Sequence, residues 1–326
     1  MSSRSASLEI KSLIVRRGVV TDPRLPLVQM PPVPYLGSVT NFSPKGPDTP
    51  GDPFVPDSGK NNRLVVFAGD IHGEWGLLAT RLGRVARRHG PIDAVFTVGD
   101  AQPVRHDKEL RMVRAPAHRL TLGDFPLVMK GEITMPAPVY FIGGNHEPYE
   151  ALDAEGAGEW GPNVFYLGRS GVQTIAGLEV AFLSGVYSPV VSEERAERTG
   201  QKSRTYWTRS ELRGLLDHPE PVDILLTHDW PDGAVPPNFR TPMGPGNEAV
   251  SELSRHLRPA VHAAGHRHRY FSAQVGPTKL LCLPDVLRSS ASVIPFHVGV
   301  HNEMTDLSGP DLAQSSSADA GIGGLE

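Results

Sequence analysis

The chain has almost no cysteine, since only Cys282 among its 326 residues carries a thiol. A single cysteine excludes an intramolecular disulfide and any thiolate-rich metal site. Metal ligands would therefore have to be His, Asp, Glu or Asn. The sequence also lacks an apolar run near the roughly 20 residues that a membrane helix requires, and its N-terminal residues lack the apolar segment of a secretory signal peptide. We therefore expect a cytoplasmic protein with no membrane contact.

A large excess of charge is also lacking. The net charge is -4, with 21% charged and 39% hydrophobic residues. These values are typical of a globular protein, and a chain of this length can bury a sizeable core. They argue against binding of nucleic acid through a general positive field, but they leave a local basic patch open.

The two ends of the chain lack the apolar periodicity of a folded core. Residues 1–62 contain ten prolines, and the last residues read AQSSSADAGIGGLE. We predict a Pro-rich N-terminal arm over residues 1–62, one domain over residues 63–303 and a flexible tail over residues 304–326.

Strand and helix patterns alternate between these ends. Short apolar runs that end near glycine predict buried strands, and the runs with 3.6-residue periodicity between them predict helices. A hairpin is expected to turn near Ala176 and Gly177, and Thr208 with Glu211 forms a capping box for a helix that ends near His218. The predicted strands include residues 64–70, 93–100, 138–144, 223–231 and 260–268.

Polar, ligand-capable side chains follow these strands. Open α/β sheets bind ligands beyond the carboxyl ends of their strands, so five such endings predict one shared site. All of them offer oxygen or imidazole nitrogen, which favours Mn, Fe, Zn, Co or Ni. The endings are GDIHG with Asp70 and His72, GD with Asp100, GGNHE with Asn145 and His146, LLTHD with His228, and AGHRH with His266 and His268.

In this order, the motifs D-x-H, GD, GNH[DE], H and GHxH resemble those of the calcineurin-like metallophosphoesterases, over residues 63–302. Within that superfamily the chain is most similar to RNA lariat debranching enzymes, through GDAQPVR, FIGGNHE, GPNVFYLG and THDWP. The resemblance implies a four-layer α/β/β/α sandwich, with two sheets packed together and flanked by helices. It also implies two divalent metal ions, with Mn favoured. The implied ligands are Asp70, His72 and His268 for one ion, Asn145, His228 and His266 for the other, and Asp100 as the bridge.

The same resemblance implies the reaction. A hydroxide that bridges the two ions would attack a phosphoester, and His146 would protonate the leaving group as general acid. Glu147 would orient its neighbours. A diester is favoured over a monoester as substrate because debranching enzymes are nucleases. Taken one at a time, His228, His266 and His268 could each be an ordinary structural histidine, and only their combination with the other motifs predicts a metal site. The remaining histidines match no motif.

Substrate contacts are predicted from basic and aromatic residues. Arg105 follows the second strand and matches an arginine of the debranching pattern, and Arg204 and Tyr206 lie in a basic segment over residues 193–213. Such a segment can follow a phosphate backbone and stack bases. The alternative is a solvated loop and helix face, since Glu193, Glu194, Glu197 and Glu211 dilute its charge.

Three functions remain open at this point. The first is a metal-dependent phosphodiesterase, and nucleic acid is one candidate for its phosphoester substrate. The second is a debranching nuclease for 2′,5′ linkages, and the third is a catalytically silent binding module of the same fold. Eukaryotic debranching enzymes commonly carry cysteine at the position of Asp70, whereas this chain keeps the acidic form. The GDYVDRG motif of Ser/Thr protein phosphatases is missing, because AQPVR follows Asp100. The oligomeric state stays open.

Overall fold

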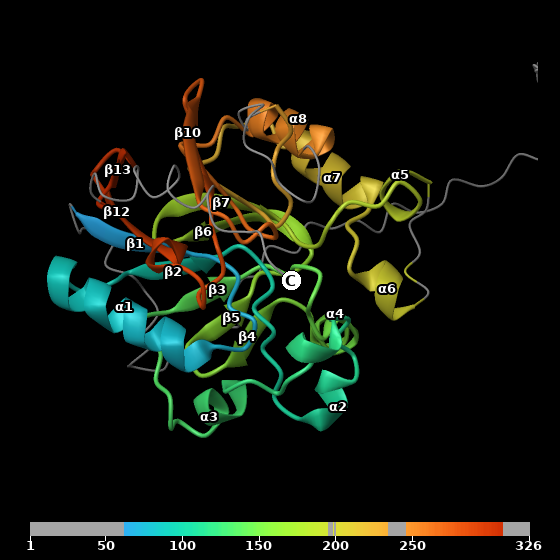
Figure 1. Cartoon of the computed structure of the whole chain (residues 1–326). Coiled ribbons are helices and arrows are strands. Elements are labelled where there is room, and N and C mark those ends of the chain that lie inside the picture. Colours follow the sequence, from blue (N-terminus) through green and yellow to red (C-terminus); the bar gives the residue numbers. More distant parts are fainter. Residues whose placement is uncertain (1–61, 195–197, 199, 234–245, 309–326) are drawn as a thin grey trace, which may run out of the picture. The chain divides into compact units, whose positions relative to one another are not determined.

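A computed structural model describes residues 62–194, 198, 200–233 and 246–308, all of which belong to the compact unit Asp52–Glu326 (Figure 1). The predicted Pro-rich arm therefore lies outside the described residues, apart from its last residue. No helix in these ranges combines the length and the apolar character that crossing a bilayer requires.

The first sheet has seven strands in the order β13-β12-β1-β2-β3-β5-β4. Strands β1, β2, β3 and β5 run parallel, while β12 pairs antiparallel with β1. The bounds are β1 Arg63–Ala68, β2 Ala94–Thr97, β3 Val139–Phe141, β4 Gly158–Gly161, β5 Val164–Tyr166, β12 Val293–Val298 and β13 Met304–Asp306.

The second sheet has six strands in the order β10-β11-β9-β8-β7-β6. Its centre is also parallel, because β7, β8, β9 and β11 run in one direction and only the edge strands β6 and β10 are antiparallel. The bounds are β6 Ser170–Ile175, β7 Leu178–Leu183, β8 Ile224–Thr227, β9 Val261–Ala264, β10 Phe271–Val275 and β11 Thr278–Cys282.

Helices connect these strands and cover the sheets. The predicted hairpin and capping box are confirmed, since Ala176 and Gly177 both have positive φ at the β6–β7 turn and Thr208 caps α7 together with Glu211. The helices are α1 Trp75–His89, α2 Asp107–Leu110, α3 Phe125–Met129, α4 Tyr149–Glu155, α5 Val191–Glu194, α6 Gln201–Arg204, α7 Arg209–Leu216 and α8 Glu248–Leu257, with 3-10 turns at Ala117–Arg119 and Ser290–Ser292.

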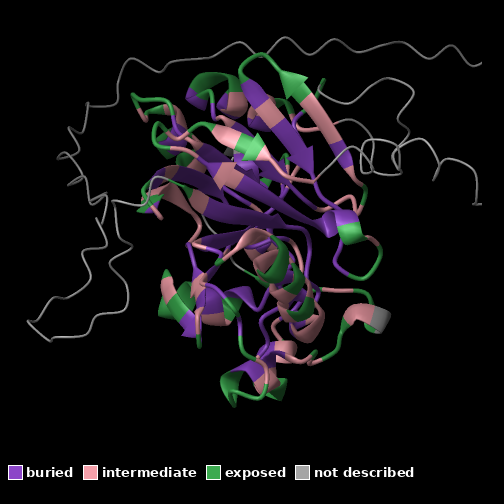
Figure 2. Cartoon of the chain, turned by 90° about the vertical axis from the view of Figure 1, so that its left-hand side faces the viewer, coloured by how far each residue is buried: buried purple, intermediate pink, exposed green. Residues whose placement is uncertain are grey.

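The alternation of side chains along β1 creates two separate cores. Leu64 and Val66 belong to the cluster that contains α1, whereas Val65 and Phe67 belong to the cluster shared with the second sheet. Successive side chains of a strand point to opposite faces, so a run of apolar residues such as LVVFA can be buried on both. In Figure 2 the strands in the middle of the fold are coloured as buried.

A third cluster completes the layers. Leu225 of β8 packs with Leu215 of α7 and Leu253 of α8 on the outer face of the second sheet. Helices α1, α3 and α4 cover the first sheet, and α7 and α8 cover the second (Figure 1). The predicted α/β/β/α sandwich is confirmed.

The structure extends beyond the predicted elements at the C-terminal side. Strands β10 to β13 have no counterpart in the predicted strands, because β10 is half exposed and β12 carries Pro295 opposite Val66. Strand β13 pairs with β12, although its residues belong to the predicted tail. The sheet therefore continues past residue 303, and residues 309–326 of the predicted tail lie outside the described residues.

Candidate metal centre

The five motifs follow parallel strands of both sheets. Asp70, Asp100 and Asn145 come after β1, β2 and β3 of the first sheet, and His228 and His266 come after β8 and β9 of the second. Parallel strands present their carboxyl ends at one edge. The packing of the two sheets brings these two edges together, so the residues after the five strands can form one shared site.

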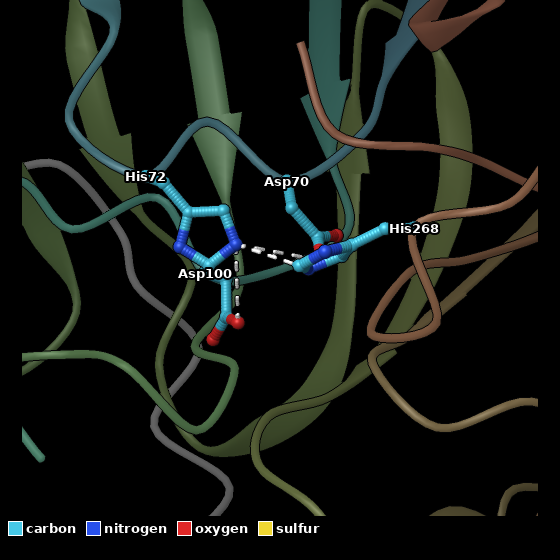
Figure 3. A group of neighbouring side chains, drawn as sticks. All are labelled: Asp70, His72, Asp100 and His268. Carbon is cyan, nitrogen blue, oxygen red and sulfur yellow. Dashed lines mark hydrogen bonds and ion pairs between the residues drawn. The ribbon is translucent and has the colours of Figure 1, made fainter. Parts of the chain in front are cut away.

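The first group of donors consists of Asp70, His72, Asp100 and His268 (Figure 3). One ligand atom from each lies within 4.8 Å of the others. His268 Nε2 is 3.0 Å from Asp70 Oδ2 and 3.1 Å from His72 Nε2, and His72 Nε2 is 3.7 Å from Asp100 Oδ2. Two nitrogens and two carboxylates thus face one small volume.

The second group meets the other oxygen of Asp100. His228 Nε2 lies 3.4 Å from Asp100 Oδ1 and 3.2 Å from Asn145 Oδ1. The ring of His266 lies beside that of His228, with 4.8 Å between centroids. Because Oδ2 of Asp100 faces His72 and Oδ1 faces His228, a single carboxylate joins both groups.

Backbone conformation around the centre is unusual. His72, Asp100, His266 and His268 all have φ between 49° and 71°, a region that non-glycine residues rarely occupy. Such conformations persist only where the surrounding structure holds them, and they concentrate at functional sites. Here they turn the backbone sharply after each strand, so the side chains point toward the centre.

Two glycines leave room for the carboxylates. A Cβ on Gly144 would lie 2.2 Å from Asp100 Oδ1, and a Cβ on Gly265 would lie 2.2 Å from Asp70 Oδ1. Real Cβ atoms do not approach so closely. The two carboxylates can therefore occupy their observed positions only because Gly144 and Gly265 have no side chain.

Hydrogen bonds fix the imidazole rings. Nδ1 of His228 donates to the carbonyl of Val98 over 2.7 Å, so the lone pair of Nε2 can face Asn145 and Asp100. Nδ1 of His268 lies 3.3 Å from Oδ2 of Asp285, a carboxylate only 1% exposed. Metal-binding histidines in proteins are held by such partners on the far nitrogen.

His146 is held differently. Its Nδ1 donates to the backbone carbonyl of Arg114 over 2.6 Å, and its Nε2 lies 3.9 Å from Asp100 Oδ2. Its backbone N–H donates to Asp100 Oδ1 over 2.8 Å. The ring therefore stands at the edge of the centre with one nitrogen directed toward it.

Glu147 lies beneath the centre. Its carboxylate accepts backbone N–H groups of Ala101, Gln102 and Gly144 at 2.8, 2.8 and 3.3 Å. Burial and the charge of Asp100 raise the pKa of Glu147 to about 8. It ties the loop after β2 to the loop after β3.

The ionisation of the donors fits a cation site. Burial lowers the pKa of His72 to about 4, and burial together with His228 lowers that of His266 to about 3, which keeps their lone pairs free. Burial also disfavours the charged form of His228, but Asp100 outweighs it and raises the pKa of His228 to about 10. A proton therefore competes with a metal ion at this ring, and metal binding would release it.

The charge of the two carboxylates supports the same conclusion. Asp70 and Asp100 are at most 1% exposed, and neither has a lysine or arginine partner in the part of the chain that the structure describes. Buried carboxylates are costly unless a cation neutralises them, and the groups that face Asp70 and Asp100 are histidines. A hard to borderline divalent ion suits this set of oxygen and imidazole donors.

A pocket of about 630 Å³ opens beside the centre. Asn145, His146 and His266 line it, and so does Tyr206, as the sequence predicts for a substrate contact. Arg105 and Arg204 do not line it. Arg105 pairs with Glu109 and Glu155 and stacks on Trp160, and Arg204 pairs with Asp153 at 2.7 Å.

Asp285 and Arg114 are not among the residues predicted from the sequence. Asp285 follows β11, which runs parallel to β9, so the same search for polar residues after strands would have found it once β11 was recognised. Arg114 contributes through a backbone carbonyl and carries no sequence signal for that role.

Comparison with known proteins agrees with this geometry. A family model described as "Calcineurin-like phosphoesterase" matches residues 64–270, which include all eight positions from Asp70 to His268. The chain is similar to the lariat debranching enzyme of Homo sapiens, with 32% identity over 231 residues, covering 64% of this chain and 42% of that protein.

Two other lariat debranching enzymes are also similar. Identity is 27% over 240 residues with that of Saccharomyces cerevisiae, covering 66% of this chain and 59% of the relative. It is 27% over 241 residues with that of Entamoeba histolytica, covering 67% and 68%. The chain thus spans about half the length of most of these relatives. Since the family model covers more than half of the chain and includes every donor of the centre, the chain belongs to the calcineurin-like phosphoesterase family.

Proposed function

We propose that the protein is a metal-dependent phosphodiesterase. Asp70, His72 and His268 would hold one divalent ion. Asn145, His228 and His266 would hold the second, and Asp100 would contact both. The observation that carries this proposal is the position of Asp100, whose two oxygens face two different sets of donors. Mn is the favoured metal, within the group of Mn, Fe, Zn, Co and Ni.

The bound ions would supply Lewis-acid catalysis at phosphorus, a nucleophile from water near neutral pH and a net positive charge that attracts the phosphate. The chain's own residues would then orient the substrate and handle its protons. Asp100 and Asp70 fix the charge of the site, while Glu147 keeps the loops that carry Asp100 and Asn145 in register.

His146 would act as the general acid. The Arg114 carbonyl accepts from Nδ1, so Nε2 is the nitrogen that faces the centre and the pocket. In its protonated form the ring would donate from Nε2 to the leaving oxygen while Nδ1–H stays bonded to the carbonyl. Proton transfer of this kind typically contributes roughly a hundred- to ten-thousand-fold in rate.

The test is a hydrolysis panel with chromogenic mono- and diesters and with linear oligonucleotides, in Mn²⁺ or EDTA. Diester hydrolysis that EDTA abolishes is expected. The His146→Ala variant should lose roughly a hundred-fold or more in turnover while it binds the same amount of metal. Equal turnover by the variant, or a loss of its metal, would contradict the role of His146.

A second candidate is a debranching nuclease for 2′,5′ linkages, favoured by the similarity to lariat debranching enzymes. It would cleave branched RNA or DNA and spare linear 3′,5′ strands. Equal cleavage of branched and linear strands would support a phosphodiesterase and contradict specificity for the branch. A silent binding module is the remaining alternative, and complete inactivity of the metal-loaded protein on every ester would favour it. The cytoplasmic compartment and the domain limits stay predictions.

A further inference from the structure

Two segments distant in sequence each form a wall of the pocket. Residues 113–116 supply one wall, and Gln201, Lys202, Thr205 and Tyr206 supply another. Gln201 Nε2 donates to the carbonyl of Arg111 over 2.9 Å, which ties the two walls together. The same first wall provides the carbonyl that holds His146. The pocket and the predicted general acid are therefore built as one unit.

Among the residues that the structure describes, no aspartate or glutamate lines this pocket, whereas Arg114 and Lys202 both do. Both side chains are exposed, and neither forms a hydrogen bond or ion pair with any residue that the structure describes. With His146 and His266 also present, the lining residues that the structure describes are all neutral or basic. An anion is the ligand that this lining favours.

The neighbouring arginines behave differently. Arg169 pairs with Asp153 at 2.7 Å, and Arg105 pairs with Glu109 and Glu155. Each of these guanidinium groups is neutralised by carboxylates of the protein itself. Arg105 and Arg169 are therefore less available to an anionic ligand than Arg114 and Lys202 are.

We infer that Arg114 and Lys202 form a second phosphate subsite, which binds a phosphate one unit away from the phosphate that is hydrolysed. The inference rests on the proposed phosphodiesterase function and defines its substrate class. The substrate would be a diester whose leaving arm carries a further phosphate, as a segment of an oligonucleotide does. The leaving arm is specified because His146, Arg114 and Lys202 line the same pocket.

The rest of the pocket suits the body of a nucleotide. Val113, Leu120 and Val186 give it apolar surface, and the ring of Tyr206 can pack against a base. A volume of about 630 Å³ is also that of a pocket for a compact ligand. The arginine would offer a planar fork of N–H donors to the phosphate and the lysine a point charge.

Binding can be measured without hydrolysis in the metal-loaded His146→Ala protein. The probes are a dinucleoside monophosphate, the same molecule with a 5′-terminal phosphate and the same molecule with a 3′-terminal phosphate. We expect one of the two phosphorylated probes to bind roughly tenfold more tightly than the unphosphorylated one. Hydrogen bonds between charged groups contribute the least binding free energy at exposed sites, so a larger factor is not expected.

Substitution of both cations should remove that preference. In Arg114→Gln/Lys202→Gln the ratio of dissociation constants should fall below about twofold, because the charge is lost while the Arg114 carbonyl remains. The control is Arg87→Gln/Lys130→Gln, which makes the same change of net charge on α1 and just after α3, away from the pocket lining. It should keep the preference. Thermal unfolding checks that both variants fold.

The outcomes separate this inference from the proposed function. A preference that survives in Arg114→Gln/Lys202→Gln, or equal binding of all three probes, overturns the subsite even if the wild-type protein hydrolyses diesters. If the wild-type protein hydrolyses no diester but the preference exists and depends on the two cations, the subsite stands and the phosphodiesterase proposal fails. Tighter binding of a phosphoserine peptide than of any dinucleotide would overturn the nucleotide assignment.

Discussion

Asp285 offers the sharpest test of how the centre is held. Its Oδ2 lies 3.3 Å from Nδ1 of His268, and the side chain is only 1% exposed. Arg119 lies 3.4 Å and Arg288 3.2 Å from the same oxygen. In Asp285→Asn the shape is kept, but the charge that orients His268 and makes its Nε2 a better donor is lost.

The expected effect is on metal affinity more than on folding. Loss of such an outer partner typically weakens metal binding by roughly 10- to 100-fold. The stability cost should be about 1–3 kcal/mol, mostly from Arg119, because a buried charge-assisted contact is lost there. Arg288 adds little, since its side chain is 64% exposed.

The measurement is Mn²⁺ binding by calorimetry, together with metal content after dialysis at a series of free Mn²⁺ concentrations. Only the ion held by His268 should weaken, so the variant should pass through a state with one ion where the wild type holds two. Asp223→Asn is the matched control. Asp223 precedes β8, at the other end of that strand from His228, and accepts the backbone N–H of Glu179 at 2.8 Å, so its loss should lower stability without changing Mn²⁺ affinity.

Two results would contradict this role of Asp285. Affinities of Asp285→Asn within twofold of wild type for both ions would show that the carboxylate does not support His268. An equal loss of affinity at both ions would show that the change acts through general unfolding of the centre.

Three further predictions concern the carboxylates and a distant histidine. Asp100→Asn should reduce the content of both ions together, because each oxygen faces a different donor set, and metal analysis that finds only one ion lost would contradict the bridge. Gly265→Ala should displace Asp70, lower the metal content and cost about 1–3 kcal/mol of unfolding free energy, and a variant with unchanged metal content would show that the loop adapts. Burial lowers the pKa of His262 to about 3 from 6.5, so the unfolded chain binds the extra proton as pH falls below 6.5 and stability is lost. Between pH 6.5 and 5 the wild type should lose about 2 kcal/mol more than His262→Gln in denaturant titrations, and parallel curves would refute this.

The sequence by itself determined the parallel strands and the residues that follow them. Strands that are buried on both faces are continuously apolar. Runs such as LVVFAGD and ILLTHD can therefore be recognised as strands from the sequence, and the polar residues that end them are easy to identify. The candidate residues from Asp70 to His268 stand out for this reason, whereas their individual roles as metal donors follow from the resemblance to the calcineurin-like metallophosphoesterases. The edge strand β10 and the antiparallel β12 were missed, because half-exposed residues and Pro295 in these segments do not give that pattern.

Only the tertiary structure decided how the donors are supported and which cations face the pocket. The carbonyl that holds His146 comes from residue 114 and the carboxylate that holds His268 from residue 285, and neither contact is encoded by a local motif. Arg105 and Arg114 are the same residue type, yet Arg105 pairs with Glu155, which lies 50 residues away in the chain, while Arg114 lines the pocket. Charge pairing depends on distances of a few ångströms between segments far apart in the chain, and folding alone sets those distances.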